Sequence, residues 1–98
     1  MTDRPNILFL LPDQLRHDFL GCYGADFLKT PAIDGLAAQG TRWQTAISPS
    51  PICVPARASM LSGQNAHASG ITHNLAWLRP DRHEMGIRTS PELLAASG

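Results

Sequence analysis

The chain has 98 residues, 43% of them apolar, and its eight basic and eight acidic side chains balance to a formal charge of zero. This length suits one small domain or part of one. Neither sign of charge collects in a block, so nucleic acid is not an expected partner. The longest apolar run, residues 7–11, is too short to span a bilayer, and the first residues lack a signal-peptide pattern. We therefore expect no membrane association and a cytoplasmic location.

The chain opens on a predicted strand. Residues 6–11 form an unbroken apolar run that Pro12 ends, which is typical of a strand buried on both faces of a parallel sheet. Asp13 and Gln14 follow at the carboxyl end of this strand, where open α/β sheets place their ligands. Glycines and a proline over residues 15–31 predict only a brief helix and loop.

A helix and a second strand are predicted next. Thr30 is a candidate cap for a short helix that starts at Pro31 and stops at Gly40. Residues 41–48 alternate as a strand, which completes a right-handed β-α-β unit and makes the fold class α/β. Two short strands cannot close such a sheet, because sheets of this kind usually have five or six. The chain is therefore expected to be an incomplete domain.

The second half is dominated by the stretch "SPSPICVPARASMLSG", residues 48–63. It predicts a short helix that begins near Pro55 and ends at Gly63, with Cys53 just ahead of it. Residues 64–89 are irregular by periodicity, and a last helix is expected from a cap at Ser90. The two cysteines, Cys22 and Cys53, are expected to be free thiols, because the chain shows no export signal.

The position of Cys53 has two readings from the residues alone. The positive end of the helix dipole and the charge of Arg57 would favour an anion beside the cysteine. Taken without their context, the two residues favour a second reading, in which Cys53 is a small buried apolar residue and Arg57 a solvated surface charge. The spacing separates these readings, because the stretch fits the pattern C-x-P-x-R-x-x-x-L-[ST]-G.

This pattern resembles the signature of the type I sulfatases, within the alkaline phosphatase-like superfamily. The resemblance extends from "RPNILFLLPDQLRHDFLGCYG" through "TPAIDGLAAQGTRWQTAIS" to the signature, and so covers almost the whole chain. It implies that residues 1–98 are the amino-terminal fragment of a sulfatase catalytic domain. The complete fold would be an alkaline phosphatase-like α/β/α sandwich with a mostly parallel central sheet.

The resemblance also implies roles for individual residues. Cys53 would be oxidised by a formylglycine-generating enzyme to formylglycine, whose hydrated aldehyde supplies the nucleophile, and Arg57 would hold it. Asp13 would bind a divalent cation, Ca²⁺ ahead of Mg²⁺ or Mn²⁺, together with the Gln14 carbonyl and a hydroxyl on residue 53. The substrate would be a small sulfate ester.

Gln14 and Asn74 point to one branch of the family. Many sulfatases carry a second aspartate after the first, whereas this chain has Gln14, as the choline sulfatase and phosphonate monoester hydrolase branch does. In that branch an asparagine at the position of Asn74 lies near the substrate's oxygens, and the resemblance implies that Gln14 and Asn74 both bind the substrate. A loop asparagine is also a common turn residue, so this alternative stays open. Phosphate and phosphonate esters are the alternative substrates.

Other readings are weaker. No pair of His17, His67, His73 and His83 has zinc-ligand spacing with the cysteines, and G-x-S-x-G is absent. For His67 and His73 two alternatives stay open, a hydrogen-bonded loop residue, which we expect, and a residue that faces the cleft. Trp43 and Trp77 are expected to be packing residues. The family's remaining ligands would lie beyond residue 98. A chain of only these residues is expected to be inert.

Overall fold

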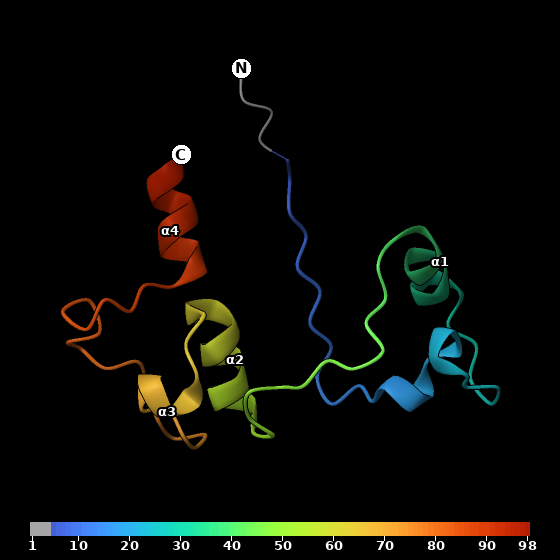
Figure 1. Ribbon diagram of the computed structural model, residues 1–98, viewed down its shortest axis with the longest axis horizontal. Coiled ribbons are helices and arrows are strands. Elements are labelled where there is room, and N and C mark those ends of the chain that lie inside the picture. Colours follow the sequence, from blue (N-terminus) through green and yellow to red (C-terminus); the bar gives the residue numbers. More distant parts are fainter. Residues whose placement is uncertain (1–4) are drawn as a thin grey trace. The chain divides into compact units, whose positions relative to one another are not determined.

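The computed structural model describes residues 5–98 as short helices joined by loops (Figure 1). The chain divides into two compact units, Met1–Gln44 and Thr45–Gly98, and each is described here by itself. Within the described part of the chain, no helix is long and apolar enough to cross a membrane.

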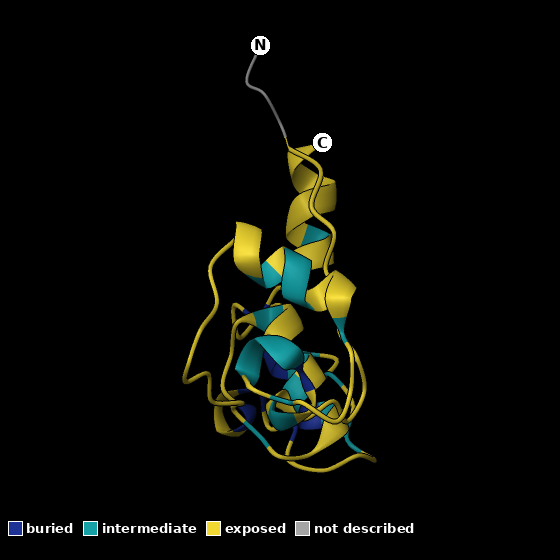
Figure 2. Ribbon diagram, turned by 90° about the vertical axis from the view of Figure 1, so that its right-hand side faces the viewer, coloured by how far each residue is buried: buried dark blue, intermediate teal, exposed yellow. Residues whose placement is uncertain are grey.

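The two predicted strands are not formed. Between residues 5 and 98 the structure contains no strand, and residues 6–11 and 41–48 lack a hydrogen-bonded ladder. The side chains of Ile7, Leu8 and Phe9 are 77%, 82% and 69% exposed. A strand needs backbone partners and covered faces, and the described residues supply neither to this run. The predicted parallel sheet is therefore not shown by these residues, and much of the ribbon is exposed (Figure 2).

The first unit is organised by short helices around Asp34. It contains the 3-10 helices η1 (His17–Phe19) and η2 (Gly21–Tyr23) and the helix α1 (Pro31–Gln39). Oδ1 of Asp34 accepts hydrogen bonds from the Cys22 backbone N–H at 2.7 Å and from the Thr30 hydroxyl at 3.1 Å. Thr30 precedes α1 as predicted, but its hydroxyl accepts from the Gly21 N–H instead of capping the helix. These bonds fasten η2 to the start of α1.

Glycine suits position 21 because a side chain there would have to displace the carboxylate of Asp34. A Cβ atom on residue 21 would lie 2.5 Å from Oδ2 of Asp34, closer than real Cβ atoms approach another atom. The brief helices before Pro31 and the short helix after it confirm the predictions for this part of the chain.

The second unit packs three helices around a small core. These are α2 (Cys53–Ser62), α3 (Ala66–Ser69) and α4 (Ser90–Ser97), and α2 contacts both of the others (Figure 1). The buried side chains come from α2, α3 and the loops beside them: Pro55, Ser59, Ala66, Ser69, Ile71 and Ile87. The sequence pattern did not predict α3. Its local signal is Asn65, whose side chain accepts a hydrogen bond from the His67 backbone N–H at 3.1 Å.

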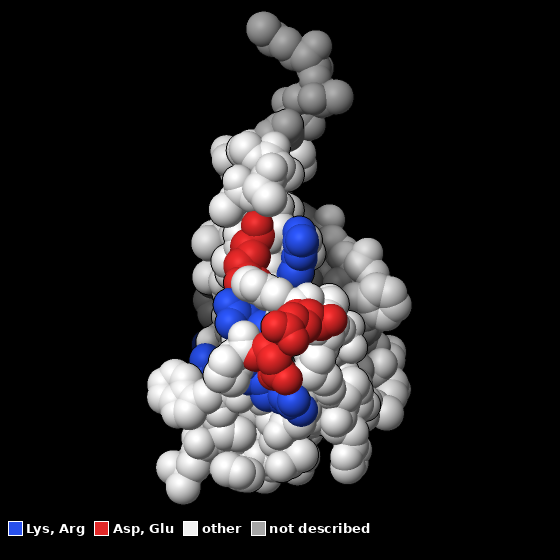
Figure 3. Space-filling model, turned by 90° about the vertical axis from the view of Figure 1, so that its left-hand side faces the viewer, with Lys and Arg blue, Asp and Glu red and all other residues white. Residues whose placement is uncertain are grey.

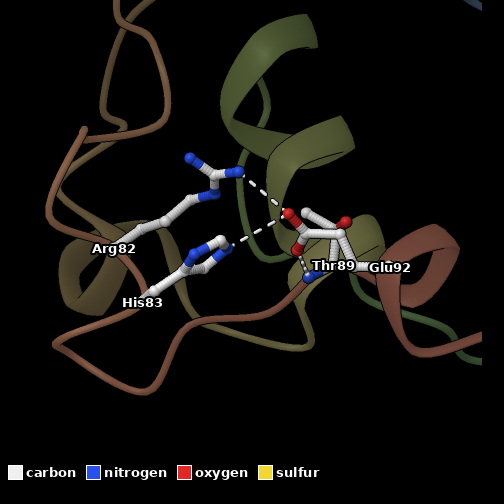
Figure 4. Close-up of polar contacts among 4 residues, drawn as sticks. All are labelled: Arg82, His83, Thr89 and Glu92. Carbon is white, nitrogen blue, oxygen red and sulfur yellow. Dashed lines mark hydrogen bonds and ion pairs between the residues drawn. The ribbon is translucent and has the colours of Figure 1, made fainter. Parts of the chain in front are cut away.

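The cap of α4 is Thr89, one residue before the predicted Ser90. Thr89 and Glu92 form a capping box, in which Oε2 of Glu92 accepts from the Thr89 backbone N–H at 2.7 Å. Oε1 of Glu92 also accepts from Nη2 of Arg82 at 2.8 Å and contacts Nε2 of His83 at 3.2 Å (Figure 4). The same Glu92 therefore caps α4 and fastens the preceding loop to it. Acidic and basic side chains lie next to one another on this face of the molecule (Figure 3).

We expect α4 to lose helicity in acid through Glu92. The Thr89 N–H first, then Arg82 and His83, lower the pKa of Glu92 from 4.5 to about 2. Because the folded pKa lies below the unfolded one, the stabilisation is present above about pH 4.5 and is lost as the pH falls through about 2. Circular dichroism from about pH 6 to about pH 1.5 measures this loss. Glu92→Gln should flatten the profile, and Glu84→Gln, at an exposed site in the same unit, should leave it unchanged. Identical profiles for both variants would contradict the assignment.

Candidate functional site at the amino terminus of α2

The site is built on the first turn of α2. The helix begins at Cys53 itself, after Ile52 with extended dihedral angles, and not at Pro55 as the sequence predicted. Pro55 occupies the third helical position, where a missing N–H breaks no intrahelical bond. Cys53 is thus part of the first turn, and its thiol is free and exposed.

Asn74 is bound directly to this turn. The Val54 backbone N–H donates to Oδ1 of Asn74 at 3.0 Å, across 20 residues of sequence. The first N–H groups of a helix have no intrahelical acceptor, so Asn74 acts as a cap supplied by a distant loop. The bond uses the oxygen of the amide, and its NH₂ group is the part with donor capacity toward a ligand. The structure thus brings Asn74 to the residue next to Cys53.

Few backbone donors remain at this helix end. Val54 has given its N–H to Asn74, Pro55 has none, and the Ala56 N–H bonds to the Ile52 carbonyl at 3.0 Å. An anion beside Cys53 would therefore be held by the helix dipole and side chains more than by a nest of amides.

Arg57 lies one helical turn after Cys53. Residues four apart share one face of a helix, so the spacing places the cysteine and the arginine on the same side of α2. Arg57 is exposed, as is Leu61 one turn further on. Gly63 ends the helix with φ of 66°, a left-handed conformation that favours glycine. The signature thus covers the whole of α2 and its carboxyl-terminal cap.

Asp13 and Gln14 belong to the first unit. Both are exposed, directly after the apolar run. Gln14 has a φ of 57°, the only positive value at a non-glycine residue in the described part of the chain. A left-handed non-glycine residue costs of order 1 kcal/mol, and such strain gathers at ligand sites. Among the described residues, the one left-handed non-glycine backbone therefore falls within the predicted ligand pair Asp13 and Gln14.

The described residues do not form a complete metal centre. Within residues 5–98 no three His, Cys, Asp or Glu side chains cluster so that they could hold a metal ion. A hard cation such as Ca²⁺ needs six or more oxygen ligands. Asp13 stays a predicted single ligand.

Two tryptophans depart from the sequence prediction. Trp43 and Trp77 were expected to pack, but their side chains are 70% and 88% exposed. His73 agrees with its expected role as a hydrogen-bonded loop residue, because its Nδ1 accepts from the Leu75 N–H at 3.2 Å. Cys22, the other free thiol, is half-buried beside a hollow of about 530 Å³ in the first unit, next to α1.

Comparison with known proteins assigns the family. Residues 5–96 match the family described as Sulfatase. The chain therefore belongs to the sulfatase family, and this membership implies an alkaline phosphatase-like fold for the complete domain.

Sulfatases from distant organisms contain a similar segment. Human arylsulfatase D is 43% identical over 68 residues, which are 69% of this chain and 12% of that protein. The N-acetylglucosamine-6-O-sulfatase of Bacteroides thetaiotaomicron is 32% identical over 97 residues, 99% of this chain and 16% of that protein. An arylsulfatase of Clostridium perfringens is 37% identical over 67 residues, 68% of this chain and 14% of that protein. The chain thus spans less than a fifth of the length of these relatives. No solved structure matches it significantly.

Removing the Asn74 cap should loosen the start of α2. Asn74→Ala leaves the Val54 N–H without its side-chain acceptor, and the loss of such a cap costs about 1 kcal/mol. Asn74→Asp keeps an acceptor and adds a negative charge at the positive end of the helix, so it should retain the stability. Urea unfolding and hydrogen exchange at the Val54 amide measure both variants. Equal exchange rates in Asn74→Ala and the unchanged protein would rule out the cap.

Proposed function

We propose that the whole protein hydrolyses sulfate esters with a formylglycine made from Cys53. The observation that carries this proposal is the sulfatase signature laid along α2. Its cysteine opens the helix, its arginine follows one turn later, and its glycine ends the helix. The family match over residues 5–96 supports the same reading. The substrates named for the relatives differ, so the proposal names the bond that is cleaved and not a particular ester.

The residues around Cys53 suit an anionic substrate. Formylglycine supplies an oxygen nucleophile that can expel the bound sulfate afterwards, which an unmodified thiol cannot do. The positive end of α2 and the guanidinium of Arg57 favour negative charge at this position. The NH₂ of Asn74 would donate to a sulfate oxygen in this proposal, since the amide oxygen of Asn74 already accepts from the Val54 N–H.

Making this nucleophile requires a partner. We propose that a formylglycine-generating enzyme reads the stretch around Cys53, Pro55 and Arg57 before the protein is active. Cys53 is exposed in the structure, which suits access by such an enzyme. A divalent cation, Ca²⁺ ahead of Mg²⁺ or Mn²⁺, would use Asp13, the Gln14 carbonyl and a hydroxyl of the formylglycine as ligands, and would take the others from outside residues 1–98. A cytoplasmic location remains part of this proposal.

Phosphorus esters are the second candidate substrates. The observation that favours them is Gln14, which stands directly after Asp13 with a left-handed backbone. A neutral amide here, in place of a second carboxylate, reduces the negative charge around a cation and its anionic substrate. Phosphonate monoesters and phosphodiesters would fit the same nucleophile. We also propose that residues 1–98, as an isolated segment, have no activity of their own.

Turnover by the full-length protein tests the proposal. The protein, made together with a formylglycine-generating enzyme, would be assayed on an aryl sulfate, a phosphodiester and a phosphonate monoester. Peptide mass analysis of residues 48–63 would show whether Cys53 has lost its sulfur and two hydrogens and gained one oxygen. A preference for the sulfate ester supports the proposal. A preference for the phosphorus esters would replace it with the second candidate, and no hydrolysis of any ester with Cys53 fully converted would refute both.

A further inference from the structure

Asn74 stands at the corner of a tight turn. The Ala76 backbone N–H donates to the His73 carbonyl at 3.1 Å, which closes a turn that has Asn74 as its second residue. From this corner, Oδ1 of Asn74 accepts from the Val54 N–H at the start of α2. The directions open to a side chain depend on the backbone angles of its own residue. The shape of the turn therefore decides whether the Asn74 amide reaches α2.

The side chain of His73 adds a second hydrogen bond to this turn. Nδ1 of His73 accepts from the Leu75 backbone N–H at 3.2 Å, two residues further along the chain. Aspartate and asparagine are favoured at the first position of turns because a side-chain oxygen accepts in the same way. A ring nitrogen that accepts must carry its lone pair, so the proton of the neutral imidazole lies on Nε2. The imidazole of His73 thus does here what a short polar side chain usually does.

The chain that enters the turn is anchored in the core of the second unit. Ile71 is 1% exposed, and its backbone N–H donates to Oγ of Ser69, itself 2% exposed, at 3.3 Å. Residues 72–75 are all exposed. The anchor fixes where the loop leaves the core, whereas the exposed turn depends on its own hydrogen bonds for its shape. His73 supplies the acceptors of two of these bonds, one from its backbone and one from its ring.

We propose that His73 is a positioning residue for Asn74. Its ring holds the turn in the shape in which the Asn74 oxygen caps α2 next to Cys53, and so leaves the Asn74 NH₂ available to the substrate. His73 acts through Asn74 and does not itself contact the substrate. The effect on turnover rests on the proposed function, whereas the effect on the helix cap does not.

Hydrogen exchange of single amides in the full-length protein tests the turn without turnover. His73→Ala should speed exchange at Leu75 and at Val54 by about three- to tenfold, because the first loses its acceptor and the second has a less firmly held one. Oδ1 of asparagine and Nδ1 of histidine are both bonded to Cγ, so His73→Asn should restore slow exchange. The side-chain oxygen of glutamine lies one bond further out, so His73→Gln should exchange as His73→Ala does. Thr72→Ala, at the exposed residue before His73, is the matched control and should leave both amides unchanged.

Turnover of 4-nitrophenyl sulfate by the formylglycine-bearing protein tests the link to the site. His73→Ala should lower kcat/KM by about three- to tenfold, and His73→Asn should stay within about twofold of the unchanged protein. In a protein that already carries Asn74→Ala, His73→Ala should cause no further loss, because the residue through which it acts is gone. Thr72→Ala should hydrolyse the ester as the unchanged protein does.

Three results would overturn the inference. They are unchanged Val54 exchange in His73→Ala, equal rescue by asparagine and glutamine, and an undiminished effect of His73→Ala on top of Asn74→Ala. The last of these would mean that His73 contacts the substrate directly. A protein that hydrolyses no ester but shows the expected exchange pattern would refute the proposed function and still support the role of His73 in holding the Asn74 cap.

Discussion

Cys53→Ala should abolish sulfate-ester hydrolysis by the full-length protein, with a loss of about 10³-fold or more in kcat. The variant has no sulfur to oxidise, so no formylglycine can form and no oxygen nucleophile is present at the start of α2. Cys53→Ser keeps an oxygen but lacks the second hydroxyl of a hydrated aldehyde, so it should react at most once and then stop. Steady-state turnover and a pre-steady-state burst assay separate these two outcomes.

The second cysteine of the chain gives this prediction its control. Cys22 is a free, half-buried thiol of the first unit, and its recorded contact to Asp34 is made by its backbone N–H. Cys22→Ala preserves that bond and should retain turnover and the conversion of Cys53. If Cys53→Ala retained turnover while Cys22→Ala lost it, the nucleophile would have been assigned to the wrong thiol.

Local signals in the sequence predicted α1, α2 and α4, and missed the four-residue helix α3. Pro31 and Gly40 bracket α1, and Gly63 ends α2, because caps and breakers act on the residues beside them. The errors at the starts of α2 and α4 are one or two residues. They arise because Pro55 is tolerated at any position of the first turn, and because the spacing from Thr89 to Glu92 makes Thr89 the better cap.

Local sequence signals could not predict whether the two strands form. The run at residues 7–11 has the composition of a buried strand, but a strand is stabilised by backbone partners, and these are often distant in sequence. The described residues offer it none, and it stays exposed. The contact between Asn74 and Val54 is similarly nonlocal, since nothing in the spacing of 20 residues predicts a cap. The resemblance to a family placed Asn74 near the site, and the structure gives it a physical role there.

The apolar run should drive self-association of the isolated 98-residue chain. Its side chains are largely exposed, and its backbone N–H and C=O groups form no ladder within residues 5–98. An extended apolar segment whose backbone groups are unpaired in this way is a template for pairing with another copy. Leu8 and Leu10, two residues apart, would lie on one face of such a strand. Replacing both with lysine adds two charges that a paired copy would have to bury or repel.

Leu8→Lys combined with Leu10→Lys should therefore raise the concentration at which half of the chain is associated by about tenfold or more. Analytical ultracentrifugation over a concentration series measures this midpoint. Leu75→Lys combined with Trp77→Lys is the matched control, because it places two lysines on exposed apolar residues with the same spacing in the other unit. If the control raised the midpoint as much as the first pair did, general hydrophobicity would explain the association. A shift confined to the first pair locates the association in the apolar run that precedes Asp13.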